Sequence, residues 1–164
     1  MRSPIDLKRF AEHVVYEIEM LLATDVLLLH SEFGRRLSGR FHPTLHNALL
    51  QSHTIHVRNL YAFFYEKRRW REDAIAADYV SDWHALRPSP SDELTRSPDR
   101  VDIEIVHLSY GRLRGKTSWT FWKLTDELLE VVKTWRDQAP EYFAPPISEL
   151  LEAHRKHRRP FKLI

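Results

Sequence analysis

The sequence predicts an all-α protein: an up-down four-helix bundle with a long connection after the second helix and a short C-terminal helix. Two observations predict this fold. Apolar residues recur with the period of an amphipathic helix along most of the chain. Only 4 glycines occur among the 164 residues, which disfavours a sheet with many tight turns and suits helices joined by longer loops. A chain of this length is expected to form one domain, residues 1–164, with its own hydrophobic core.

The first two helices are expected before residue 67. Pro4 followed by Asp6 is typical of a helix start, and the helical rhythm of apolar residues continues to about Leu29. The second helix is expected over residues 43–66, after a turn region that contains glycine and proline. Apolar and polar residues share the stripes of this second helix, so we expect it to be central and buried on more than one side.

A long connection is expected over residues 67–99, with one short helical segment at residues 74–80. A connection of this length in a compact domain is often functional, although it can also wrap the bundle. Ser97 and Pro98, an N-cap residue followed by proline, predict that the third helix begins there. Gly111 is the expected end of that helix.

A strand is the alternative for the first part of this third helix. Val101, Ile103 and Ile105 alternate with two acidic residues, which is a strand pattern. However, Val101, Ile105 and Leu108 also fit a helix, and a lone strand would have no partner elsewhere in the chain. We therefore favour the helix.

Two further helices complete the predicted fold. The fourth is expected over residues 118–138, where three tryptophans and several aliphatic residues supply the apolar content before Pro140 stops the helix. A short helix is expected over residues 148–156, and a basic end covers about residues 154–164.

The composition indicates a globular cytoplasmic protein. The net charge is only +2, but basic residues gather at 67–71, 112–116 and 154–159. Such clusters can bind phosphate backbones or simply form a solvated face. The chain has no cysteine, which excludes disulfides and fits a reducing compartment. The charged start lacks a signal peptide's apolar region, and no apolar run approaches the ~20 residues of a membrane span. We expect no membrane association.

Polar residues interrupt two apolar segments that are far apart in the chain. These candidate binding or network residues are His53, His56, Arg58 and Asn59 in the second helix, and Tyr110 and Arg112 beside His107. A buried polar group without a partner costs ~1–3 kcal/mol, so the two clusters are expected to form one hydrogen-bond network or one site. We expect His56 and His107 on facing helices, in a pocket shared with Arg58, Asn59 or Tyr110.

Arg100 and His107 are the candidate catalytic residues. Their spacing is almost two turns of an α-helix, so both side chains would project from the same face. A guanidinium can bind a phosphate bidentately, and an imidazole can move a proton near neutral pH. The pair therefore suits phosphodiester chemistry. The alternative is a buried, hydrogen-bonded His107 with Arg100 on the surface.

Metal binding is a separate possibility for the histidines. His53 and His56 lie three residues apart and could share a metal ion. The default is that they are satisfied polar residues of the core, because few further ligands are within plausible reach. We expect no metal and no other cofactor.

Three motifs carry a resemblance to a known family. Residues 56–64 read His-x-Arg-Asn-Leu-x-x-Phe-Phe, residues 73–79 read Asp-x-x-Ala-Ala-Asp-Tyr, and residues 107–112 read His-Leu-Ser-Tyr-x-Arg. With them, roughly residues 45–138 resemble a group of uncharacterised bacterial helical-bundle proteins. The layout of that group is similar to HEPN domains, four-helix bundles often found in toxin–antitoxin and phage-defence systems.

The resemblance also implies an activity. Active HEPN nucleases carry arginine, a spacer of about four to six residues, and histidine; Arg100 and His107 match with 6 residues between them. The residue after that arginine is usually polar in the family, whereas here it is Val101, with Asp102 one place later. The resemblance implies metal-independent RNA cleavage by a dimer. His107 would assist attack by the ribose 2′-hydroxyl, and Arg100 would hold the scissile phosphate.

Two functions stay open at this point. One is a HEPN-like RNA-binding or RNA-cleaving protein, which as an enzyme would be a metal-independent endoribonuclease, with a cognate antitoxin or other partner protein. The other is a non-enzymatic interaction module in which the histidines and arginines form a structural polar network. In either case three tryptophans on one helix, Trp119, Trp122 and Trp135, exceed the needs of the core. We therefore expect a homodimer that packs at least partly through residues 100–138.

Overall fold

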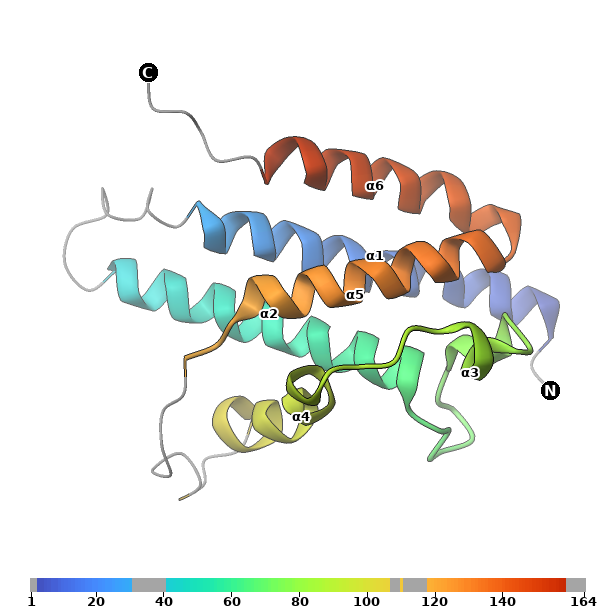
Figure 1. Cartoon of the computed structure of the whole chain (residues 1–164), viewed down its shortest axis with the longest axis horizontal. Helices are drawn as coiled ribbons and strands as arrows, with labels where there is room; N and C mark the ends of the chain where they lie inside the picture. The colour runs from blue at the N-terminus through green and yellow to red at the C-terminus, as the bar shows by residue number, and fades with distance from the viewer. Residues whose placement is uncertain (1–2, 31–40, 107–109, 111–117, 159–164) are drawn as a thin grey trace.

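The computed structural model describes residues 3–30, 41–106, 110 and 118–158. These residues contain six α-helices, short 3₁₀ and π-helical segments, and no strand. The prediction of an all-α protein is therefore confirmed for this part of the chain. Figure 1 shows α1 (Pro4–Leu29), α2 (Phe41–Tyr65), α5 (Phe121–Gln138) and α6 (Ala144–His157) as the long helices. The short helix α4 (Asp92–Val101) packs against α2.

Helix α1 has the predicted bounds. The side chain of Ser3 caps its start, because the Ser3 hydroxyl oxygen accepts a hydrogen bond from the Asp6 backbone N–H at 3.1 Å. Its buried face packs against α2, α5 and α6. Thr24 and Asp25, two polar residues, are buried on this helix. Helix α1 is therefore the central contact partner of the long helices.

Helix α2 follows the prediction, whereas the connection after it is shorter and more helical than predicted, because α3 (Trp83–Leu86) lies within it and α4 begins at Asp92. Helix α2 covers Phe41–Tyr65, and the short helical segment expected near residue 77 is the 3₁₀ turn Ala76–Asp78. The connection is anchored rather than loose, because Trp83 of α3 is buried and its indole N–H donates to the Phe64 carbonyl at 2.8 Å.

The predicted start of the third helix is wrong. Helix α4 begins at Asp92, and the hydroxyl of Ser91 accepts from the Leu94 N–H at its N-cap. Pro98 lies inside the helix, where its missing N–H leaves the Leu94 carbonyl without the usual donor. The buried Ser97 hydroxyl donates to that carbonyl at 2.7 Å. A side chain thus replaces the missing backbone bond, which lets the helix run through the proline.

The end of the third helix also differs from the prediction. Helix α4 stops at Val101, and Asp102–Val106 forms a π-helical segment. The expected end at Gly111 lies outside the described residues. The π-helical turn is wider than an α-helical one, with i→i+5 hydrogen bonds, and such turns are frequent at functional sites.

The C-terminal helix is longer than predicted. Helix α6 covers Ala144–His157 instead of 148–156, because it begins directly after the 3₁₀ turn Glu141–Phe143. Phe143 and Ile147 are fully buried in the core, and α6 packs mainly on α1. Trp135 of α5 is also fully buried, with its ring centroid 4.4 Å from that of Phe143. Trp119 precedes α5, so only two of the three tryptophans belong to this helix, and the expectation that they exceed the needs of the core is wrong for Trp135.

Among the described helices, none combines the length and the apolar character that a membrane span requires.

Candidate functional site

His53 lies in the centre of the protein, between three helices. Its Nδ1 is 3.1 Å from the Thr24 hydroxyl of α1, and its Nε2 is 3.4 Å from the Thr125 hydroxyl of α5. Burial lowers the pKa of His53 from the usual 6.5 to about 4, although the charge of Asp25 opposes this shift. A neutral imidazole has one donor and one acceptor nitrogen, and each of the two nitrogens lies beside a buried hydroxyl. This geometry is that of a structural core residue.

His56 lies one turn further along α2 and has a different partner. Its Nδ1 is 2.7 Å from Oε2 of Glu17 on α1. The side-chain amide of Asn59 donates to the same oxygen at 3.2 Å. The ring of Tyr16 packs edge-on against the imidazole. His56 and Asn59 therefore meet at Glu17, a partner that could not be named from the sequence.

Arg58 and Tyr110 are not part of that pocket. Nε of Arg58 is 2.9 Å from Asp102, and both side chains are more than a third exposed. Tyr110 is 87% exposed. His107 and Arg112 lie outside the described residues, so the expected proximity of His56 and His107 stays a prediction.

Arg100 is held on two sides. Its guanidinium lies over the ring of Trp119, 3.9 Å from the ring centroid. Nε and Nη2 of Arg100 donate to the two carboxylate oxygens of Glu104 at 3.1 and 3.3 Å. The side chain retains 22% of its exposure. Cation–π stacking and a bidentate ion pair together fix the position of this arginine.

The residues between Arg100 and His107 do not form one continuous α-helix. The predicted shared face requires an α-helix through both residues, whereas Asp102–Val106 is π-helical. Each residue of a π-helix turns through a smaller angle than in an α-helix. A seven-residue spacing across this segment therefore does not by itself place two side chains on one face.

A third buried histidine was missed by the sequence analysis. Nε2 of His154 on α6 is 2.9 Å from Oδ2 of Asp25, and Nε of Arg158 is 3.0 Å from the same oxygen. Asp25 is fully buried, and its Oδ1 has no hydrogen-bond partner among the described residues. Arg158 also pairs with Asp126 at the surface. Asp25 interrupts the apolar run of α1, and this is the signal that could have found the cluster.

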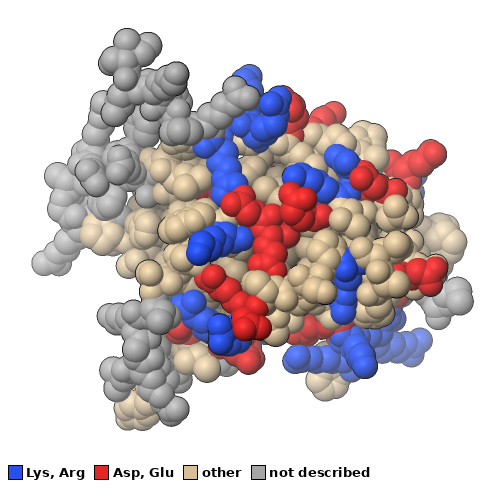
Figure 2. Space-filling model, viewed as in Figure 1, with Lys and Arg blue, Asp and Glu red and all other residues tan. Residues whose placement is uncertain are grey.

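Two of the three basic clusters are largely neutralised by neighbouring carboxylates. In the first, Arg68 pairs with Asp78 and Arg69 with Glu66. In the last, Arg155 pairs with Glu152, and Arg158 with Asp25 and Asp126. Figure 2 shows basic and acidic side chains interleaved across the displayed face. Residues 112–116 lie outside the described residues. The described clusters therefore form a mixed-charge surface.

No group of three or more histidine, aspartate or glutamate side chains within the described residues could hold a metal ion. No family model, no curated protein and no solved structure matches the chain significantly.

Proposed function

We propose that the protein is a HEPN-like, cytoplasmic RNA-binding protein of the toxin or defence type that cleaves RNA without a metal. Arg100 and His107 are its proposed catalytic residues. The proposal includes an up-down four-helix bundle, for which the long helices α1, α2, α5 and α6 are the candidates. These helices lie side by side in Figure 1, and α1 contacts each of the other three.

The observation that supports this proposal best is the way Arg100 is held. A guanidinium has five N–H donors in a fixed plane. The stack on Trp119 orients that plane, and Glu104 accepts hydrogen bonds from Nε and Nη2 of the guanidinium. A phosphate that replaced Glu104 would meet the same bidentate fork in the same orientation. The Arg100 guanidinium thus fits an anion that presents two oxygens, and in the described structure that anion is the carboxylate of Glu104.

The proposed reaction is an internal transfer at phosphorus. Arg100 binds the scissile phosphate and stabilises the charge that develops on it. His107 accepts the proton of the ribose 2′-hydroxyl, whose oxygen then bonds to phosphorus. The bond from phosphorus to the 5′-oxygen of the next nucleotide breaks, and that oxygen leaves as a hydroxyl with the proton that His107 returns. The product ends in a 2′,3′-cyclic phosphate. Each step uses only side chains and RNA.

The test is cleavage of single-stranded RNA by the full-length protein in the presence of EDTA. We expect the wild type to release 2′,3′-cyclic phosphate ends, and Arg100→Ala and His107→Ala to lose cleavage while the thermal midpoint changes little. Arg96→Ala is the matched control, because Arg96 is an exposed arginine on the same helix. The proposed nuclease activity would be refuted if the wild type did not cleave RNA, or if both catalytic variants cleaved it at the wild-type rate.

A further variant tests the role of Glu104. If Glu104 competes with phosphate for Arg100, Glu104→Gln should strengthen RNA binding, because the charge that holds the guanidinium is removed. We expect roughly a tenfold gain, from the ~1.5–3 kcal/mol of a charged hydrogen bond. A binding constant that is unchanged or weaker would contradict the anion-site argument. Filter binding at a fixed salt concentration gives the readout.

The second candidate function is a non-enzymatic interaction module. It is favoured by the fact that His53 and His56 have partners of their own inside the protein. In this reading the histidines are structural and the partner is another protein, such as a cognate antitoxin. His53→Ala and His56→Ala would then lower stability without any RNA activity to lose.

Both functions are compatible with a homodimer. Ile103 and Trp122 are exposed large apolar side chains in and near α4 and α5, at 45% and 40%. Tyr110, with its far greater exposure, belongs to the same stretch of sequence. We propose that this stretch packs against a second copy. Light scattering should give the mass of a dimer at micromolar concentration, and a monomer at high micromolar concentration would refute the proposal.

A further inference from the structure

A cavity lies beside the Glu17–His56 pair. It has a volume of about 300 Å³ and opens between α1, α2 and the segment after α2. Phe10 and Val14 of α1, Leu60 and Phe63 of α2, and Ile75 supply its apolar walls. This volume and this lining are those of a small-molecule site with few polar groups.

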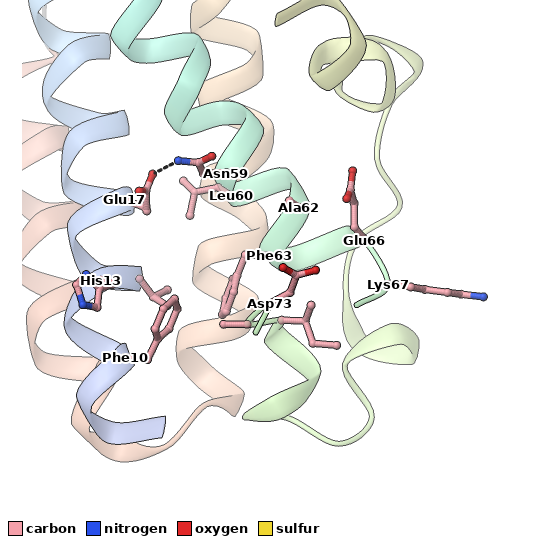
Figure 3. Close-up of a pocket in the computed structure, with 13 residues that line it drawn as sticks. Phe10, His13, Glu17, Asn59, Leu60, Ala62, Phe63, Glu66, Lys67 and Asp73 are labelled. Carbon is pink, nitrogen blue, oxygen red and sulfur yellow. Dashed lines mark hydrogen bonds between the residues drawn. The ribbon is translucent and has the colours of Figure 1, made fainter. Parts of the chain in front are cut away.

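The polar groups of the cavity are mostly hydrogen-bond acceptors. Glu17, Glu66 and Asp73 contribute three carboxylates to the lining. Lys67 is the one ammonium in the described lining, and Figure 3 shows its side chain pointing away from the cavity. His13 is the remaining ionisable side chain of the lining. Glu66 pairs with Arg69, and Asp73 accepts from the backbone N–H groups of Arg69 and Trp70, so Glu17 is the carboxylate best placed to receive a ligand.

Two side chains of α2 hold the carboxylate of Glu17 through one of its oxygens. His56 and Asn59 both bind its Oε2, which leaves Oε1 without a donor among the described residues. A carboxylate only accepts hydrogen bonds, so the amide nitrogen of Asn59 must face Glu17 and its amide oxygen is left as a second acceptor. Figure 3 shows the two side chains together at one end of the cavity, with Phe10 and Phe63 further along it.

A ligand for these groups must bring positive charge and N–H donors at one end and an apolar body at the other. We propose that the cavity binds a small organic ammonium ion, with its nitrogen at Glu17 and Asn59 and an aromatic or aliphatic body between Phe10 and Phe63. An ammonium group donates three hydrogen bonds and gains from the faces of aromatic rings. This site is separate from Arg100 and does not depend on RNA cleavage.

Calorimetric titration of the full-length protein with phenethylammonium tests the proposal, with phenylacetate as the probe of equal shape and opposite charge. We expect the cation to bind and phenylacetate to give no measurable heat. Glu17→Gln should weaken cation binding at least about tenfold, because it removes the charge but keeps a polar side chain beside His56. Glu12→Gln, an exposed glutamate of the same helix, is the matched control and should bind like the wild type.

A second variant covers the case in which Glu17→Gln does not fold. Ala62→Phe places a ring in the cavity from α2 without removing a charge, and circular dichroism checks that its helices are intact. It should abolish binding of the cation. No binding by the wild type, equal binding of phenylacetate, or wild-type affinity in Ala62→Phe would each overturn the proposal.

Discussion

Thr24 and Asp25 are adjacent on α1, yet they face two different environments. Thr24 meets His53 on the side of α2 and α5, and Asp25 meets His154 and Arg158 on the side of α6. His53 meets two hydroxyls and backbone groups of Leu21 and Phe121, whereas His154 meets a carboxylate. One side of α1 is therefore held by neutral hydrogen bonds and the other by buried charge.

The difference teaches how neutral and charged partners stabilise the same core in different ways. Around His53, burial dominates and the imidazole is kept neutral. The fully buried Asp25 carboxylate needs hydrogen-bond donors and a cation beside it, because an unpaired buried charge is costly. His154 and Arg158 surround one oxygen of that carboxylate. The two sides of α1 should therefore respond differently to mutation and to pH.

The largest effect is expected from Asp25→Ala. The change leaves His154 and Arg158 without their buried carboxylate, and breaking such a cluster costs ~3–5 kcal/mol. Asp126→Ala is the matched control, because Asp126 is the other carboxylate of Arg158 but is 55% exposed. We expect it to lose less than ~1 kcal/mol. Urea unfolding at neutral pH gives both values, and equal losses would mean that burial does not distinguish the two carboxylates.

The next effect is a pH dependence on the neutral side of α1. The unfolded chain protonates His53 near the usual pKa of 6.5, whereas the folded protein resists protonation until about pH 4. Unfolding therefore takes up a proton in this window, and stability falls as the pH drops through it. The loss amounts to ~3 kcal/mol when the pH reaches the folded pKa.

The variant His53→Leu isolates this contribution, because it removes the titrating ring and retains an apolar side chain. Between pH 6.5 and 4 the wild type should lose stability more steeply than the variant, although other groups titrate in both proteins. Parallel pH profiles from denaturant unfolding would show that His53 is not held neutral by the core.

The smallest effect is expected at the exposed pair Arg58–Asp102. Both side chains are more than a third exposed, so solvent screens their attraction. Arg58→Ala should cost less than ~1 kcal/mol, and the difference should shrink further in molar salt. A loss as large as that of Asp25→Ala would show that this surface pair supports the π-helical segment. Thermal unfolding at low and high salt is the measurement.

Much of the helical layout could be predicted because it follows from local chemistry. The period of apolar residues and the proline after Ser3 set the start of α1, and both bounds agree with the prediction. The start of α4 could not be predicted in the same way. Ser97 and Pro98 have the residue types of a helix start, but the Ser97 hydroxyl satisfies the Leu94 carbonyl and the helix continues through the proline.

The candidate site, too, could be predicted only in part. The sequence by itself determined that α2 carries polar residues where a core helix would carry apolar ones, and that such residues need partners. Which partner each one meets was decided only by tertiary packing. His53 and His56 lie three residues apart, yet the first meets hydroxyls from α1 and α5 and the second meets Glu17. Spacing along one helix fixes directions around its axis, but the chemistry of a buried group depends on helices distant in sequence.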